Sequence, residues 1–154
     1  MKITEPMTMI TDYLLAAVCL AFMFMTLRAR STHPAALLWV EMFFVAAVAA
    51  TLGGTHHGFK TNMNPGLAKG LWEFTLITIG ASAAFMIAAA TASGIRSGGD
   101  HAWWIWCGLI VSAAGFAVQK SGWDVHPSFN HNDLYHLIQI AGFWCLYEGA
   151  RRLP

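Results

Sequence analysis

The sequence predicts an all-α membrane protein, a polytopic bundle of about five transmembrane helices. Of its 154 residues, 56% are hydrophobic and only 11% are charged, whereas a soluble globular chain carries about 25% charged residues. Several apolar runs approach the ~20 residues that a helix needs to cross a bilayer. A net charge of +1 without a basic run argues against a nucleic-acid partner. We expect one integral membrane domain over residues 1–154.

The apolar runs are separated by short segments rich in turn-forming residues. NMNPG, SGIRSGGD and SGWDVHPS lie between runs, and their glycine, proline, asparagine and serine residues favour turns. The predicted spans are residues 9–28, 34–56, 70–92, 103–119 and 132–150.

The basic residues favour one orientation in the membrane. In a five-span layout Arg28, Arg30, Arg96, Arg151 and Arg152 share one side, and the lysines lie on the other. Cytoplasmic segments carry an excess of basic residues. We therefore expect the N-terminus outside and the C-terminus inside, in a bacterial inner membrane. Ion pairs with these arginines are predicted for Glu41 and Glu148.

Small residues recur at four-residue spacing in two spans, which lets transmembrane helices approach closely. Gly80, Ala84 and Ala88 share one face of the third span, and AAVAATLGG at 46–54 has a similar pattern in the second. We expect both faces to pack inside the bundle, with a dimer interface as the alternative for such faces.

Polar side chains from all five spans converge on one membrane face in this layout, whichever face is outside. Ionisable residues within a membrane usually line a cavity or bind a partner. The layout therefore predicts a shared metal or polar site. The residues delivered there are Thr11, Asp12, Thr51, Thr55, His56, His57, Trp72, Glu73, Gln119, His131, Asn132, Asp133 and His136.

The start of the last span carries the densest group. Asn130 is placed to cap the helix, and Asp133 lies in its first turn. Asn132 and His136 are four residues apart and share a helix face. His131 is about 140° round the helix from His136, so it can approach the same site only from the first turn. His136 is the deepest, ~6 Å below Asn132, and burial there requires a partner.

These side chains suit a catalytic zinc ion, which typically has three protein ligands and a water that becomes a hydroxide nucleophile. We expect His57, His131 and His136 as ligands. His56 is the reserve, because adjacent helical residues point about 100° apart. The general base or the partner of a ligand imidazole is Asp12 or Asp133. An oxyanion is stabilised by Asn132 or Thr55.

Two alternatives remain open at this point. Haem b held by His57 and His136 is the alternative cofactor, in a protein that binds a metal or haem without catalysis. A structural bundle whose polar rim only caps helices is the other.

The TD pair at 11–12, the histidine that ends the second span and HNDLYHLIQIAG at 131–142 resemble a known superfamily. It comprises alkaline ceramidases, hemolysin III-like proteins and progestin/adipoQ receptors, and small bacterial membrane proteins related to the ceramidases share the same features. The resemblance covers the first two spans and the last. It implies a zinc-dependent membrane hydrolase with three histidine ligands. The expected reaction is hydrolysis of an amide or ester bond in a lipid-like substrate that enters between helices.

The chain also departs from that superfamily's pattern. The superfamily has seven spans instead of five. The first histidine of its last-helix His-x-x-x-His pair falls on Asn132, so His131 has to substitute from one residue away. Its early Ser-x-x-x-His is not matched, because Gly53 stands four residues before His57. These differences put the full ligand set in question.

Overall fold

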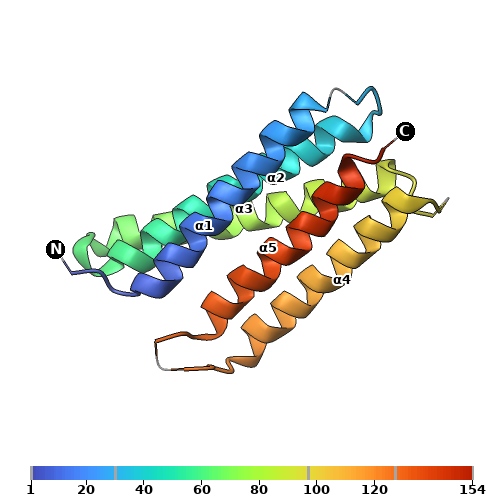
Figure 1. The fold of residues 1–154 in the computed structure, drawn as a ribbon. Coiled ribbons are helices and arrows are strands. Elements are labelled where there is room, and N and C mark those ends of the chain that lie inside the picture. The colour runs from blue at the N-terminus through green and yellow to red at the C-terminus, as the bar shows by residue number, and fades with distance from the viewer. Residues whose placement is uncertain (1, 30, 97, 127, 154) are drawn as a thin grey trace.

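Five long antiparallel helices make up the computed structural model, which describes residues 2–29, 31–96, 98–126 and 128–153 (Figure 1). No strand is formed within these ranges, so the predicted all-helical bundle is confirmed. A short 3₁₀ helix, η1, spans Lys60–Asn62. The long helices are α1 Pro6–Arg28, α2 Ala35–Phe59, α3 Pro65–Ala92, α4 Asp100–Ser121 and α5 His131–Ala150.

Local capping sets the starts of α1 and α3, which the apolar runs alone placed a few residues too late. α1 starts at Pro6 and α3 at Pro65, each with proline in the first turn, where its fixed φ suits a helix start. The Asn64 side chain accepts a hydrogen bond from the Leu67 amide at 2.8 Å. Asn130 and Asp133 form a reciprocal capping box at the start of α5, as the sequence predicts.

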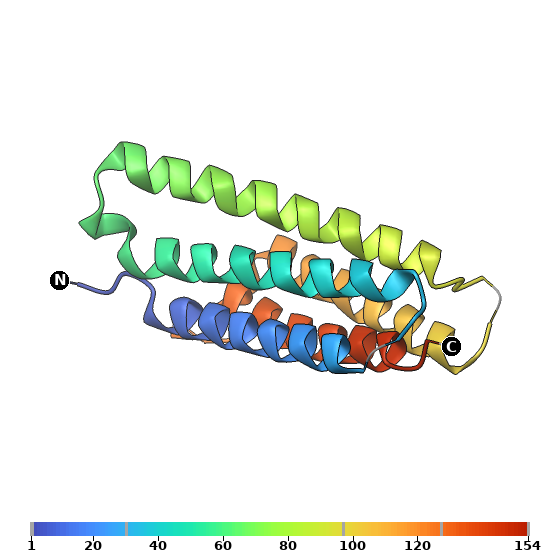
Figure 2. The same ribbon diagram turned by 90° about the horizontal axis from the view of Figure 1, so that it is seen from above.

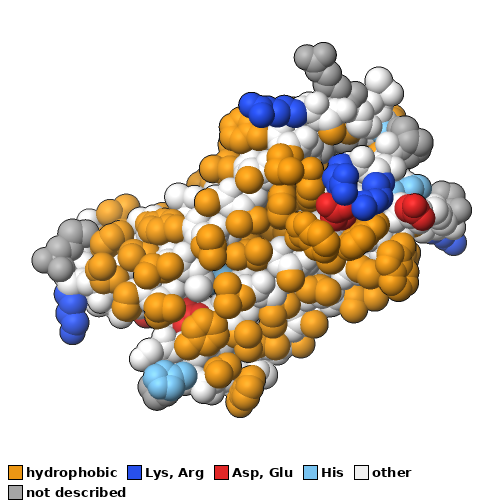
Figure 3. All heavy atoms as spheres, viewed as in Figure 1, with side chains coloured by type: hydrophobic (Ala, Val, Ile, Leu, Met, Phe, Trp, Pro, Cys, Tyr) orange, Lys and Arg blue, Asp and Glu red, His pale blue; other side chains and the backbone are white. Residues whose placement is uncertain are grey.

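Among the described residues, four helices are long and apolar enough to cross a membrane: α1, α2 together with η1, α3 and α4. They indicate an integral membrane protein. Hydrophobic side chains cover much of the face seen in Figure 3. α5 is outside this group and carries more polar residues, but Asp133, His136, Gln139 and Glu148 are buried. It packs against α1 and α4, so its polar side chains face protein.

The helices pack side by side in the order α3, α2, α1, α5, α4. Although α3 and α4 follow each other in the chain, they make at most slight contact and lie at the two ends of this row. Figure 2 shows α3 set apart from the α4–α5 pair. This packing order leaves room for a cavity between α3 and α4.

The two ends of the bundle differ in character. We call the end where α1, α3 and α5 begin the polar end, and the opposite one the arginine end. Aromatic and aliphatic side chains, including Trp39, Phe43 and Leu146, fill the interior toward the arginine end. Arg28, Arg96 and the Arg151–Arg152 pair all lie at that end, as predicted; Arg30 is outside the described residues.

One of the two acid predictions for the arginine end is confirmed, and the other stays a prediction. Glu148 is buried and binds both Arg151, at 2.7 Å, and Arg152. Glu41 is exposed and forms no ion pair with any described residue. It lies on an outward face of α2, where the described arginines do not reach it.

Glycines allow close helix contacts, but only one of the two predicted small-residue faces, the one on α2, packs against another helix. Gly54 packs against α1, where an added Cβ would lie 3.0 Å from the Asp12 Cβ. The prediction for the third span is wrong: Gly80, Ala84 and Ala88 are exposed. A tight contact that the sequence analysis missed joins α4 to α5, where a Cβ on Gly108 would lie 2.9 Å from the Gly142 carbonyl oxygen.

Gly108→Val tests the α4–α5 contact. The added side chain meets backbone that cannot rotate away, so we expect at least about 1–3 kcal/mol of destabilisation and a lower melting temperature in detergent. Gly80→Val is the matched control, because a Cβ there meets nothing within 4 Å. Equal melting temperatures for the two variants would contradict the packing described here.

The alternating helices put the chain termini at opposite ends of the bundle (Figures 1 and 2). Lys2→Cys and Arg151→Cys, each at an exposed position and in a background lacking the native cysteines, should therefore react with a membrane-impermeant thiol reagent from opposite sides of sealed vesicles. Labelling of both positions from the same side would contradict the five-span topology.

Candidate functional site

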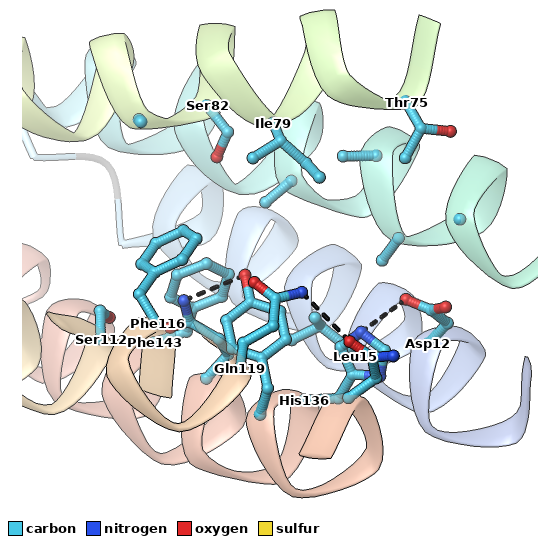
Figure 4. A pocket seen from close by; sticks show the side chains of 18 of the residues that line it. Asp12, Leu15, Thr75, Ile79, Ser82, Ser112, Phe116, Gln119, His136 and Phe143 are labelled. Atoms are coloured by element: carbon cyan, nitrogen blue, oxygen red, sulfur yellow. Dashed lines mark hydrogen bonds and ion pairs between the residues drawn. The ribbon is translucent and has the colours of Figure 1, made fainter. Parts of the chain in front are cut away.

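A cavity of about 330 Å³ opens between α3 and α4 and is lined by residues from all five long helices (Figure 4). This volume lies within the usual range for small-molecule sites. Trp72 of α3 and Phe116 of α4 line it and are 36% and 37% exposed, so the cavity reaches the surface between these two helices. In a membrane that surface faces lipid.

A buried polar contact in the cavity wall joins α1 to α5. His136 Nε2 lies 3.1 Å from Asp12 Oδ1, and both side chains are less than one-tenth exposed. The other ring nitrogen, Nδ1, lies 3.0 Å from the Thr11 hydroxyl. Asp12 and His136 line the cavity and Thr11 does not, so Thr11 holds the imidazole from behind.

The hydrogen bonds of Thr11 restrict the protonation of His136. The Thr11 hydroxyl lies 3.1 Å from the carbonyl oxygens of Met7 and Thr8 and 3.0 Å from His136 Nδ1, and it has one proton to donate. If the hydroxyl donates to a carbonyl, Nδ1 donates to Thr11, and a hydrogen bond between Nε2 and Asp12 needs one further proton, which leaves the pair without net charge. If the hydroxyl donates to Nδ1, Nε2 donates to a carboxylate, and the pair carries one negative charge. The pair has no net positive charge in either case.

Glycines of α2 make room for this pair. A Cβ on Gly53 would lie 3.4 Å from both carboxylate oxygens of Asp12. Gly58, four residues after Gly54, packs on Met9 one turn before Asp12. The small residues of α2 therefore let α1 approach closely enough to bury a carboxylate within the bundle.

A polar stripe on α5 continues the wall away from the polar end. Asn132, Tyr135, His136, Gln139 and Phe143 all line the cavity, at spacings that repeat along one helix face. Gln139 Nε2 donates to the Tyr135 hydroxyl at 3.3 Å. The wall thus changes from polar at Asn132 to aromatic at Phe143.

Three buried polar atoms of cavity-lining residues have no hydrogen-bond partner among the described residues: Asp12 Oδ2, Ser112 Oγ and Gln139 Oε1. Their residues are at most 4% exposed. An unsatisfied buried polar group costs about 1–3 kcal/mol, and native proteins contain few of them. Such groups around a cavity are typical of a binding site.

An ion-pair cluster closes the polar end of the cavity. His57 lines the cavity, and its Nδ1 lies 2.6 Å from Glu5, which also pairs with Lys60. Burial raises the pKa of Glu5, but hydrogen bonds from Lys60 and His57 outweigh that effect and leave the pKa below its ordinary value of 4.5. The Thr4 and Glu5 amides donate to the Gly58 and His57 carbonyls, which fixes the N-terminal segment on α2.

The structure brings half of the predicted site residues together. Asp12, His57, Asn132 and His136 line the cavity, and His56, His131, Asp133 and Thr55 do not. His56 packs on Trp72, with ring centroids 4.9 Å apart. The Asp133 carboxylate caps α5 by accepting from the Asn130 amide at 2.8 Å.

The two remaining residues bond elsewhere. Thr55 donates to the Thr51 carbonyl and contacts Tyr13. His131 binds Asp124 in the α4–α5 connection, with 2.7 Å between His131 Nδ1 and the carboxylate. These hydrogen bonds with His131 lower the pKa of Asp124.

The predicted three-histidine zinc ligand set does not match this arrangement. His57, His131 and His136 each bond a different carboxylate, those of Glu5, Asp124 and Asp12. Both ring nitrogens of His136 are engaged. Within the described ranges, no three His, Cys, Asp or Glu residues are grouped to hold a metal ion. Haem ligation by His136 would also need one of its ring nitrogens, and these already bond Thr11 and Asp12.

Comparison with known protein families assigns the chain to one family. It belongs to a family of unknown function, DUF6962, which matches residues 7–97 and 86–154. No curated protein and no solved structure matches the chain. The DUF6962 match carries no link to the ceramidase superfamily, so that resemblance remains a prediction.

Several lining residues of this DUF6962 chain were missed at the sequence level, although their spacing held a signal. Ser112 lies seven residues before Gln119, which the sequence already placed at this site, and Thr75 and Ser82 are seven residues apart on α3. That spacing keeps two side chains on one helix face. Gln139, three residues after His136, extends the α5 stripe in the same way. A search for polar residues at heptad spacing within apolar helices would have found them.

Asp12→Ala tests whether the Asp12–His136 pair holds α1 against α5. The change leaves His136 Nε2 buried without a partner, which should cost about 1–3 kcal/mol and lower the melting temperature. Asp12→Asn should be milder, because an amide N–H can still donate to Nε2. Glu41→Ala, at an exposed acid, is the control. A melting temperature unchanged by Asp12→Ala would refute the pair's structural role.

The lowered pKa of Glu5 predicts a pH dependence at the N-terminus. A carboxyl group with a lower pKa in the folded state stabilises it fully above the unfolded value, near 4.5, and less as pH falls through the folded value. Amide-exchange protection of Thr4 and Glu5 should therefore drop below about pH 4.5. Glu5→Gln should remove this dependence, and Glu73→Gln should preserve it. Protection independent of pH in the wild type would contradict the assignment.

Proposed function

We propose that this chain binds a lipid-like amphiphile in the cavity between α3 and α4. The supporting observation is the composition of one continuous wall. It carries Asp12, His136 and Asn132 toward the polar end and Phe143 and Met86 toward the arginine end. A molecule with a polar head and an apolar tail matches both parts.

The position of the opening supports access from the bilayer. α3 and α4 are apolar enough to span a membrane and make at most slight contact with each other. An amphiphile can therefore enter sideways without passing through water. Binding also recovers free energy, because donors on its head can satisfy acceptors that are buried without partners in the wall.

The Asp12–His136 pair gives this site a chemical capability beyond binding. Asp12 Oδ1 and His136 Nε2 lie 3.1 Å apart, and both residues line the cavity. A carboxyl–imidazole pair can take up or release a proton at a bound head group with little change in its surroundings. Thr11 acts as a positioning residue that fixes the imidazole.

The second candidate is the zinc-dependent hydrolase of a lipid amide or ester. One observation favours it: Asp12, His57 and His136 line the same cavity. His57 is bonded through Nδ1 alone, so its Nε2 has no described partner. Metal analysis of purified protein tests this candidate. It requires near-stoichiometric zinc that His136→Ala removes.

Blocking the cavity tests the binding proposal. Ala83 lines the cavity on α3, and Ala84 next to it is exposed. Native mass spectrometry of detergent-purified protein should show retention of at least one added oleoyl amphiphile among monooleoylglycerol, oleate and oleoyl-lysophosphatidylglycerol. Ala83→Trp should abolish retention because the indole fills the cavity, and Ala84→Trp should not. The proposal fails if Ala83→Trp retains as much amphiphile as the wild type.

A further inference from the structure

From the chemistry of the cavity wall we infer that the site selects an amphiphile with an uncharged head group rich in hydrogen-bond donors, such as a monoacylglycerol, over anionic lipids. This inference rests on the proposed binding function and adds the class of ligand. Three observations support it: the unpartnered atoms, the charges of the wall and the levels at which polar groups occur.

The unpartnered atoms call for donors on the ligand. Gln139 Oε1 can only accept, because its amide nitrogen already donates to Tyr135. Asp12 Oδ2 also accepts, since Oδ1 is the oxygen that faces His136 Nε2. Ser112 Oγ can donate or accept. Hydroxyl groups of a glycerol head offer donors to Gln139 Oε1 and Asp12 Oδ2, whereas a carboxylate or phosphate offers only oxygens to these two acceptors.

The charges of the wall disfavour an anion. No Lys or Arg is among the described residues that line the cavity, and Asp12 is the one carboxylate there. The Asp12–His136 pair carries no net positive charge, and His57 is bonded to Glu5. An anionic head would therefore lose its hydration in a low-dielectric site without a compensating cation, which is costly.

The wall offers polar groups at three levels. Asp12, His136 and Asn132 form the first, toward the polar end. Gln139 lies about 4.5 Å further along α5 than His136 and forms the second. Ser112 lies beside Gly142, about 4.5 Å beyond Gln139, and forms the third, level with Phe143. A glycerol head spans the first two levels, its ester oxygens can accept from Ser112 at the third, and its acyl chain points toward the arginine end.

Titration of the purified protein in one detergent with monooleoylglycerol, oleate and oleoyl-lysophosphatidylglycerol tests the inference. Monooleoylglycerol should bind about tenfold or more tightly than either anion. Gln139→Leu, which removes an acceptor at similar volume, and Ser112→Ala should each weaken monooleoylglycerol binding severalfold. Ser121→Ala is the matched control, because Ser121 is exposed at the end of α4 and does not line the cavity.

The outcomes separate the inference from the function on which it rests. Anions that bind as tightly as monooleoylglycerol, with binding still abolished by Ala83→Trp, would overturn the head-group selectivity and leave the binding function intact. The same holds if Gln139→Leu and Ser112→Ala leave affinity unchanged. If none of the three amphiphiles binds, or if Ala83→Trp leaves binding unchanged, the proposed function itself is wrong.

Discussion

Burial of a carboxylate and an imidazole among membrane-spanning helices is the constraint on which the rest of the structure depends. Neither Asp12 nor His136 can be left unpaired at that depth, because lipid offers no hydrogen bonds. Their contact at 3.1 Å joins α1 to α5, and α5 then places α4. The α2 glycines also help to bury Asp12, because they let the α2 backbone approach α1 beside it. These glycines are Gly53, Gly54 and Gly58.

The cavity follows from that arrangement. α1 packs against α2 and α5, and α4 packs against α5. α3 packs mainly against α2. α3 and α4 are left facing each other across an open space. The polar stripe of α5 forms the back of this space, and the aromatic core toward the arginine end limits its depth. The polar lining residues therefore lie toward the polar end of the cavity, and the apolar ones lie toward the arginine end.

Helical spans and the meeting of polar residues could be predicted from the sequence, whereas individual partners could not. Long apolar runs and turn residues determine the number of helices, and alternation of the spans brings Asp12, His57, Asn132 and His136 to one end. Partner choice depends on rotation about each helix axis, which short polar patterns do not fix. His131 accordingly binds Asp124, and Glu41 faces outward. For the same reason, the sequence could not predict that the Gly80 face of α3 is turned away from the other helices.

The most direct test of a lipid-accessible cavity between α3 and α4 is photo-crosslinking in lipid nanodiscs. The probe is a monoacylglycerol with a diazirine near the end of its acyl chain, and mass spectrometry of peptides locates the label. The account predicts labels on Met86 and Phe143, which line the apolar part of the cavity. Labels confined to outward residues such as Leu76 and Ile77, which are 49% and 65% exposed, would contradict it.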